Sequence, residues 1–409
     1  MRRTLRIFIL LQRMSLKVNT SAWWGPPRKF DPRFEERRIS WLELFYDLVY
    51  VIAIARITHH LALHITWSGF LEYGGLFILI FWGWLNGSLY HDIHGTTGLR
   101  TRLMTLWQVM IIAALSVTID DASAKRFEYV TIVLMVMQLF ITYLWWSVGF
   151  YDKAHRRYNI PYTILYLLSL GLMGLSFFVS PEWMKCIVPL VILCNYAPPF
   201  ISQQLLRRSS LDLSLSSSMS ERLGLFTIIV FGEVVLGVVN GISKADIQLF
   251  STWLHFALAL SIVFTLWWIF FTLISNRDAK KGFTRASLLE LLFIPTLISL
   301  GLIASCLSYF FDPHQHINSL GDVFGYAMAC FLTCISLMMG LLDYPDTAKP
   351  IKRPVRVSLF VTALVFTGWS LSGINLGTTW NLVGLLAILI VEIVYLNSLY
   401  YALNIEEEK

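Results

Sequence analysis

Residues 41–56 read WLELFYDLVYVIAIAR, an apolar stretch that contains two acids, Glu43 and Asp47, and one base, Arg56. Glu43 and Asp47 are four residues apart and therefore share one face of a helix. A helix on the surface of a soluble protein would repeat its charges along that face, and this stretch does not. In a bilayer, Asp47 and Arg56 would each cost about 2.5–3.5 kcal/mol unless a partner or water received them. We therefore expect a site around these side chains.

The composition is that of a membrane protein. Of the 409 residues, 56% are hydrophobic and 14% are charged, and the mean hydropathy is +0.63. Apolar runs of about 18–25 residues are long enough to cross a bilayer as helices. They lie at 41–63, 70–90, 103–120, 127–150, 160–179, 183–200, 222–242, 249–275, 287–310, 321–342, 355–375 and 379–402. The sequence therefore predicts an all-α, polytopic transmembrane helix bundle of about 12 spans.

The basic residues predict the orientation of these spans. If the spans alternate in direction, all but five of the 32 Lys and Arg residues fall on the side of the N-terminus. The exceptions are Lys125, Arg126, Lys185 and Lys244 on the opposite side, and Arg56 within a span. Because Lys and Arg concentrate in cytoplasmic loops, we expect both termini to be cytoplasmic.

The second half of the chain resembles the first. Leu42-Glu43-Leu44-Phe45 opens the first span, and Leu223-Gly224-Leu225-Phe226 opens the seventh. Six spans per half give both halves the same orientation, so the sequence predicts two parallel six-helix repeats related by an axis along the membrane normal. The predicted division is a basic cytoplasmic arm (1–40), the first transmembrane half (41–200), a Ser/Arg-rich cytoplasmic linker (201–220), the second transmembrane half (221–402) and a cytoplasmic tail (403–409).

The seventh span places Glu233 near the bilayer midplane, with Gly232 beside it. Gly237 and Gly241 follow and offer a close-packing helix face. One hypothesis is that Glu43, Asp47, Arg56 and Glu233 converge between the halves as a proton- or cation-binding site. The alternative is that Arg56 pairs permanently with an acid and locks the first span to the seventh.

Other polar residues are secondary candidates. Glu221 and Arg222 lie at the cytoplasmic edge, where adjacent positions do not share a helix face, so we expect them to meet lipid headgroups or other helices. Glu392 is deep in the last span, and both interhelical hydrogen bonding and membership of the site stay open. Glu72 and Glu290 are expected at the membrane interfaces. Tyr46 and Tyr50 of the first span are also secondary candidates.

With Glu43-Leu44-Phe45-Tyr46-Asp47-Leu48-Val49-Tyr50-Val51 in the first span, and Glu221-Arg222 followed by Gly232-Glu233 in the seventh, residues 36–402 resemble the bacterial low temperature requirement A family. The resemblance implies a multi-pass protein of the bacterial cytoplasmic (inner) membrane and a role in growth in the cold. It implies no substrate. Tyr46 and Tyr50 stand where the family pattern has Phe, and their hydroxyls can bond the neighbouring acids or lie in the membrane interface.

The motifs of several enzyme classes are absent from the sequence. It holds no phosphate-binding glycine loop, nucleophile elbow, zinc-protease helix or dinucleotide fingerprint. Its longest loops are too short for a soluble catalytic domain, so an enzyme, such as a lipid-modifying one, would have to work within the membrane. We expect no catalytic residues, cofactor or nucleic-acid partner. We also expect no metal, although His60 and His64 share a helix face and are weak candidates.

Two functional hypotheses follow. The first is a proton- or cation-responsive, transporter-like protein with a charged site between its halves and an unidentified small-molecule or lipid substrate. The second is a non-transporting membrane protein that is lipid-binding, sensory or a scaffold, that is needed for growth at low temperature, and whose charge network is structural. In both, membrane lipid is a partner, and the sequence leaves the oligomeric state open.

Overall fold

The computed structural model describes residues 27–28, 39–63, 65–96, 98–121, 123–153, 156–206, 215–246, 248–275, 277–311, 320–373 and 376–407. Within these ranges the regular structure is helical, and an isolated bridge joins Ala279 to Leu342. The predicted all-α class is therefore confirmed. Most of the predicted N-terminal arm, the centre of the linker and the end of the tail lie outside the described residues.

Each predicted span overlaps a helix. The first half contains α3 (Trp41–Leu63), α4 (Trp67–His94), α5 (Leu99–Ile119), α6 (Arg126–Tyr151), α7 (Arg156–Leu175), α8 (Met184–Tyr196) and α9 (Pro198–Leu206). The second half contains α10 (Ser217–Ile242), α11 (Phe250–Leu273), α12 (Phe283–Phe310), α13 (Leu320–Leu341), α14 (Lys349–Leu371) and α15 (Thr378–Glu407). Two short 3₁₀ helices, η1 (Pro181–Trp183) and η2 (Asp346–Ala348), precede α8 and α14.

The predicted span 183–200 is not one straight helix. It is divided into α8 and α9, which meet at an angle of 44°. The break falls at Ala197, directly before Pro198 and Pro199. Proline lacks the N–H that would continue the hydrogen-bond ladder and disfavours helical geometry in the residue before it, which explains the bend.

The helices have the length and hydropathy of membrane spans. Among the described residues, 10 helices are long and apolar enough to cross a membrane, and the bent pair of α8 and α9 makes up to 11. The protein is therefore a multi-pass membrane protein. α3 is outside this set, so the count of twelve remains a prediction.

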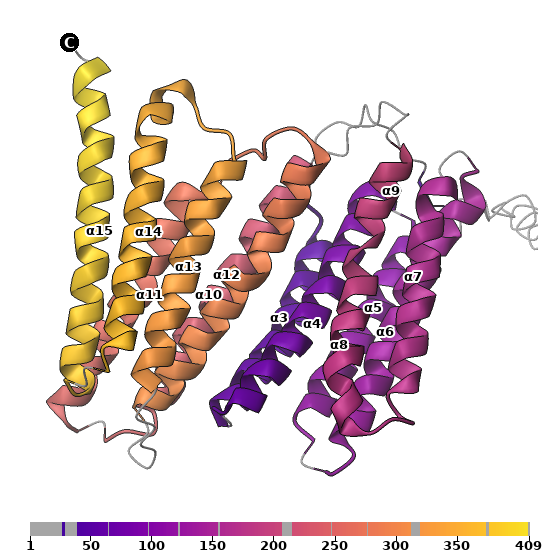
Figure 1. Ribbon diagram of the computed structural model, residues 1–409, viewed down its shortest axis with the longest axis horizontal. Helices are drawn as coiled ribbons and strands as arrows, with labels where there is room; N and C mark the ends of the chain where they lie inside the picture. Colours follow the sequence, from indigo (N-terminus) through magenta and orange to yellow (C-terminus); the bar gives the residue numbers. More distant parts are fainter. Residues whose placement is uncertain are drawn as a thin grey trace, which may run out of the picture.

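Figure 1 shows α3–α9 as one group of helices and α10–α15 as another beside it. In the first group, α3 packs against α4 and α5, α6 against α4, α5 and α7, and α8 against α4 and α7. In the second, α10 packs against α11 and α12, α13 against α11, α12 and α14, and α15 against α11 and α14. The two groups meet where α3 and α4 pack against α10 and α12.

Small residues let the helices of the second group approach closely. A Cβ atom on Gly237 would lie 2.5 Å from the carbonyl oxygen of Ala304, and one on Gly241 would lie 2.6 Å from that of Leu307. The absence of side chains at these two positions brings α10 into backbone contact with α12. The predicted close-packing face of the seventh span is therefore confirmed.

Candidate functional site

The first acid of the opening helix caps that helix. Oε2 of Glu43 accepts hydrogen bonds from the backbone N–H of Ser40 at 2.8 Å and from its hydroxyl at 3.0 Å. The Ser40 hydroxyl oxygen accepts in turn from the N–H of Glu43 at 3.3 Å. This reciprocal pattern is a capping box, which satisfies donors that the first turn of a helix leaves without partners. Glu43 therefore fixes the start of α3 one turn before Asp47.

The second acid, Asp47, pairs with an arginine of the other half. Nη2 and Nε of Arg222 lie 2.5 Å and 3.2 Å from its two carboxylate oxygens, and the indole N–H of Trp84 donates to Oδ1 at 2.7 Å. The side chain of Asp47 is 0% exposed and that of Arg222 is 3% exposed. A buried carboxylate needs both an opposite charge and hydrogen bonds, and Asp47 has both.

Arg222 is oriented toward Asp47 by its position in the first turns of α10. Ser216 caps this helix, and its hydroxyl oxygen accepts from the N–H of Met219 at 3.0 Å. Glu221 and Arg222 point in different directions because adjacent helix positions are about 100° apart, and Glu221 is exposed whereas Arg222 is buried. The sequence predicts that these charges meet lipid headgroups or other helices, and Arg222 does contact another helix, α3. The position of both residues at the cytoplasmic edge stays a prediction.

Aromatic rings surround the buried guanidinium group. Its Cζ atom lies 5.7 Å from the ring centroid of Tyr46 and 5.8 Å from that of Trp84, distances at which a cation is attracted by a ring. Nη1 of Arg222 is buried without a hydrogen-bond partner in the part of the chain that the structure describes. The charged site is therefore enclosed by Trp84 and Tyr46 and retains one unused donor group.

Arg56 and Glu233 lie away from this ion pair. Arg56 pairs with Asp120 at 2.7 Å, and the two side chains are 52% and 37% exposed. Glu233 is partly buried and has no hydrogen bond or ion pair with any described residue. It follows Arg222 by eleven positions, about 16 Å along α10 at 1.5 Å per residue. The structure thus brings Glu43 and Asp47 together with Arg222, and not with Arg56 or Glu233.

The tyrosines of α3 do not bond to the acids. Tyr46 is buried, and its hydroxyl donates to the carbonyl oxygen of Gly83 at 3.4 Å. Its ring centroid lies 4.7 Å from that of Tyr50, whose buried hydroxyl has no partner among the described residues. Tyr46 therefore joins α3 to α4. The Tyr50 hydroxyl can form a hydrogen bond with water or a solute inside the first half.

Glu392 is an interhelical hydrogen-bond acceptor. Its carboxylate oxygens accept from the hydroxyl of Ser358 at 2.7 Å and from that of Thr362 at 2.7 Å. The carboxylate belongs to α15 and both donors belong to α14. Of the two possibilities that the sequence left open, the structure shows hydrogen bonding between helices and not contact with the Asp47–Arg222 pair.

The interior of the first half holds several polar side chains. The hydroxyl of Tyr166 donates to Oδ1 of Asn86 at 2.6 Å, and Nε2 of Gln138 donates to the carbonyl oxygen of Tyr166 at 3.3 Å. Both polar atoms of Gln108 are buried without partners in the described residues, and they lie beside Gly87 together with the hydroxyl of Tyr46. Leaving a buried polar group without a partner costs about 1–3 kcal/mol, so water or a polar solute would be favoured there.

A second polar contact joins the halves at the start of α10. The carboxylate of Asp92 accepts from the hydroxyls of Ser216 and Ser218. Arg28 donates to the carbonyl oxygens of Asp92 at 2.7 Å and Ile93 at 2.9 Å, where the partial negative charge at the end of α4 favours a cation. These bonds attach both Arg28 and the end of the linker to α4.

Glu290 lies close to tyrosines of the first half. It lies in α12, is partly buried, and is close enough to Tyr158 and Tyr196 of the first half to interact with them electrostatically. No described residue forms a hydrogen bond or ion pair with its carboxylate. The position of Glu290 at a membrane interface stays a prediction.

The described residues contain no group of three or more His, Cys, Asp or Glu side chains that could hold a metal ion. Of the two weak metal candidates, His60 lies in α3 and His64 lies outside the described residues.

Comparison with known protein families gives a match that covers most of the chain. The family described as "Bacterial low temperature requirement A protein (LtrA)" matches residues 38–396. No curated protein and no solved structure matches the chain. The matched range includes the capping box, the Asp47–Arg222 pair and the helices from α3 through most of α15. The chain therefore belongs to the low temperature requirement A family of bacterial multi-pass membrane proteins.

Proposed function

We propose that this protein is a proton- or cation-responsive, transporter-like membrane protein, and that Asp47 and Arg222 form the charged site between its two halves. The observation that supports the proposal is the buried ion pair, which joins the opening helix of one half to the opening helix of the other. Charged groups are rare within membrane segments and commonly mark ion or substrate pathways.

The proposal includes two parallel six-helix repeats with α3 as the twelfth span. The helix neighbours support it, because each packing contact named above within α3–α8 has a counterpart within α10–α15 when α3 is matched to α10 and the others follow in order. Contacts between α3 and α5, for example, correspond to contacts between α10 and α12. Both termini would then be cytoplasmic in the bacterial inner membrane, as the distribution of Lys and Arg predicts.

The ion pair would couple proton or cation binding to the positions of the halves. While Asp47 is ionised, it holds α3 against α10 through Arg222. A proton on Asp47 removes the negative charge, and a small cation competes with Arg222 for the same oxygens. Either event leaves a buried guanidinium without its counter-charge, which favours rearrangement of the helices that hold it. The unpartnered amide of Gln108 beside Tyr46 gives water a place close to this site.

A second candidate function is a non-transporting membrane protein with a structural charge network. The observation that favours it is that Asp47 accepts bonds from Arg222 and Trp84, while Arg56 and Glu233 lie elsewhere. Such a pair can lock α3 to α10 without any turnover. A role in growth in the cold would then arise from lipid binding, sensing or scaffolding.

Proton flux in proteoliposomes separates these two functions. The purified protein is reconstituted with a pH-sensitive dye inside the vesicles, and a pH gradient is imposed in the presence of Na⁺, K⁺ or neither. We expect flux in the wild type and at least a tenfold loss in Asp47→Asn. Arg56→Gln is the matched control, because it removes one partner of the exposed ion pair, and its flux should equal that of the wild type.

Thermal unfolding in detergent is measured on the same preparations. Flux lost in a variant that remains folded at the assay temperature supports the transporter-like function. Because removal of one partner of a buried ion pair destabilises the protein under both functions, the wild type decides between them. Folded wild-type protein that gives no flux with any of these ions would favour the structural lock.

A further inference from the structure

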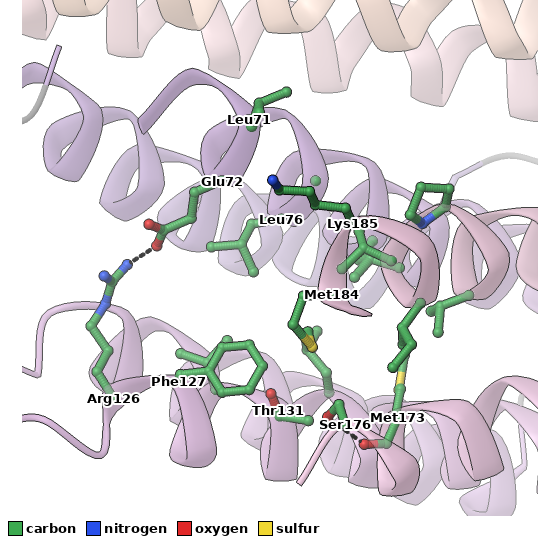
Figure 2. Close-up of a pocket in the computed structure, with 18 residues that line it drawn as sticks. Leu71, Glu72, Leu76, Arg126, Phe127, Thr131, Met173, Ser176, Met184 and Lys185 are labelled. Atoms are coloured by element: carbon green, nitrogen blue, oxygen red, sulfur yellow. Dashed lines mark hydrogen bonds and ion pairs between the residues drawn. The ribbon is translucent and has the colours of Figure 1, made fainter. Parts of the chain in front are cut away.

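The first half contains a cavity that is separate from the Asp47–Arg222 pair. It lies between α4, α6, α7 and α8 and has a volume of about 550 Å³ (Figure 2). Ligand pockets in proteins commonly measure about 300–1,000 Å³. Its walls are mainly apolar and include Leu76, Val130, Met173 and Ile187. The cavity is therefore large enough for a ligand with a substantial hydrophobic part.

Charged side chains gather at one end of this cavity. They are Glu72 in the second turn of α4, Arg126 at the first position of α6 and Lys185 at the second position of α8. Arg126 forms an ion pair with Glu72. Figure 2 shows Lys185 extending toward the same region, and no described residue forms a hydrogen bond or ion pair with its ammonium group. The mouth of the cavity thus holds Arg126, which is paired with Glu72, and Lys185, which can pair with a negatively charged ligand.

These cations are unusual for their side of the membrane. With alternating spans, the side opposite the N-terminus carries the Lys and Arg residues Lys125, Arg126, Lys185 and Lys244. Arg126 and Lys185 line the cavity, and Lys125 directly precedes Arg126. Two of the four basic residues on this side therefore line one cavity, where their positive charge attracts a negatively charged group.

The dimensions match one leaflet of a bilayer. The lining residues of α4 extend from Leu71 to Leu79, about 12 Å along the helix axis at 1.5 Å per residue. The hydrocarbon part of one leaflet is about 15 Å thick, half of the bilayer core. Glu72, Arg126 and Lys185 all lie near the start of their helices, at the level where lipid headgroups are found.

We propose that this cavity binds a membrane phospholipid, with one acyl chain between α4, α6, α7 and α8 and with its phosphate contacted by Lys185 and Arg126. A phospholipid combines the two features that the cavity complements, a long apolar chain and a negatively charged oxygen-rich headgroup. The site goes beyond the proposed function, because α6, α7 and α8 lie outside the contact of α3 and α4 with α10 and α12. Proton flux and lipid binding can therefore be tested independently.

Two neighbouring glycines provide a matched pair of variants. Gly75 lines the cavity, and a Cβ there would lie 3.7 Å from Cγ1 of Val188 in α8. A Cβ on Gly74 would have nothing within 4 Å. Gly75→Leu therefore fills the cavity, whereas Gly74→Leu makes the same chemical change in the same turn of α4 outside it.

Native mass spectrometry measures the bound lipid. The protein is purified in a mild detergent, and dioleoyl phosphatidylglycerol is added in steps. We expect one tightly held phospholipid in the wild type and in Gly74→Leu, and at least a fivefold lower occupancy in Gly75→Leu. Lys185→Gln should lower the occupancy about threefold, whereas Lys244→Gln, which changes a lysine on the same side but outside the cavity, should not. Equal occupancy in Gly74→Leu and Gly75→Leu would overturn the proposal.

A measurement on the wild-type protein covers the case in which Gly75→Leu does not fold. In liposomes, phosphatidylglycerol with a photoreactive diazirine on its acyl chain should label the apolar walls of the cavity, which include Leu76, Val130, Met173 and Ile187. Excess unlabelled phosphatidylglycerol should suppress that labelling. Labelling spread over all lipid-facing helices without competition would overturn the proposal, and so would suppression by inorganic phosphate alone, since the mouth would then bind a free anion.

Discussion

Tyr73 of α4 lies directly against Gly301 of α12, so that its hydroxyl group occupies the space into which a side chain at position 301 would project. The same hydroxyl donates to the carbonyl oxygen of Ile298 at 3.3 Å. One turn further along α12, the hydroxyl of Ser305 lies 3.0 Å from the carbonyl oxygen of Thr58 in α3. The two halves therefore contact each other closely at the end of the bundle away from Arg222, as well as through the ion pair.

We predict that Gly301→Leu lowers the stability of the protein. The new side chain would force Tyr73 away from α12, and such overpacking typically costs about 1–3 kcal/mol. The melting temperature in detergent measures the effect. Gly368→Leu is the control, because that glycine is an exposed residue of α14 with open space around its position. Equal shifts in the two variants would show that the contact between the halves does not depend on Gly301.

We predict that Asp47→Asn strongly destabilises the protein. The change leaves Arg222 buried without its counter-charge, and breaking a buried ion pair by removing one partner costs about 3–5 kcal/mol. Chemical denaturation followed by tryptophan fluorescence measures the loss. Arg56→Gln removes one partner of an exposed pair and should cost at most about 1 kcal/mol. A loss in Asp47→Asn no greater than that of Arg56→Gln would mean that water already reaches Arg222.

We predict that Glu233→Gln changes stability by less than about 0.5 kcal/mol, the usual range for substitutions that break no specific contact. The reason is that no described residue is bonded to Glu233. The same denaturation experiment tests this. A change in stability of several kcal/mol would contradict the prediction and show that Glu233 has a partner. A loss of proton flux at unchanged stability would show that Glu233 takes part in transport.

We predict that Glu392→Gln is tolerated and that Glu392→Leu loosens the last helix. A glutamine can still accept one of the bonds from Ser358 and Thr362, whereas leucine leaves both hydroxyls without an acceptor on α15. Each lost interhelical bond costs about 1 kcal/mol. Limited proteolysis of the C-terminal helix should be faster in Glu392→Leu than in the wild type. Equal rates in the two would show that the apolar contacts of α15 suffice.

The sequence predicted the helices because hydropathy is a local property. The predicted span 41–63 has the same bounds as α3, and the others differ at their ends by a few residues. The break between α8 and α9 was missed although its signal, Pro198-Pro199 inside an apolar run, was visible in the sequence. The capping box could also have been predicted from the sequence, since Ser40 precedes Glu43 by three positions.

The site was less predictable because it depends on which helices touch. Asp47 and Arg222 are separated by 175 positions, and no local pattern indicates that α3 packs against α10 with these two residues at the same depth. The sequence singled out Asp47 as a costly group, which required a partner, and named Arg222 only among secondary candidates. Identifying that partner required the order of the helices in space.

The attachment of Asp92 to Ser216 and Ser218 has a consequence for how the chain can be divided. Together with Arg222, it anchors the beginning of α10 to the first half by contacts that do not pass through residues 207–214. A polypeptide interrupted within that stretch would keep every one of these contacts. Two fragments ending and beginning there, made from separate genes in one cell, should consequently find each other and co-purify as a complex.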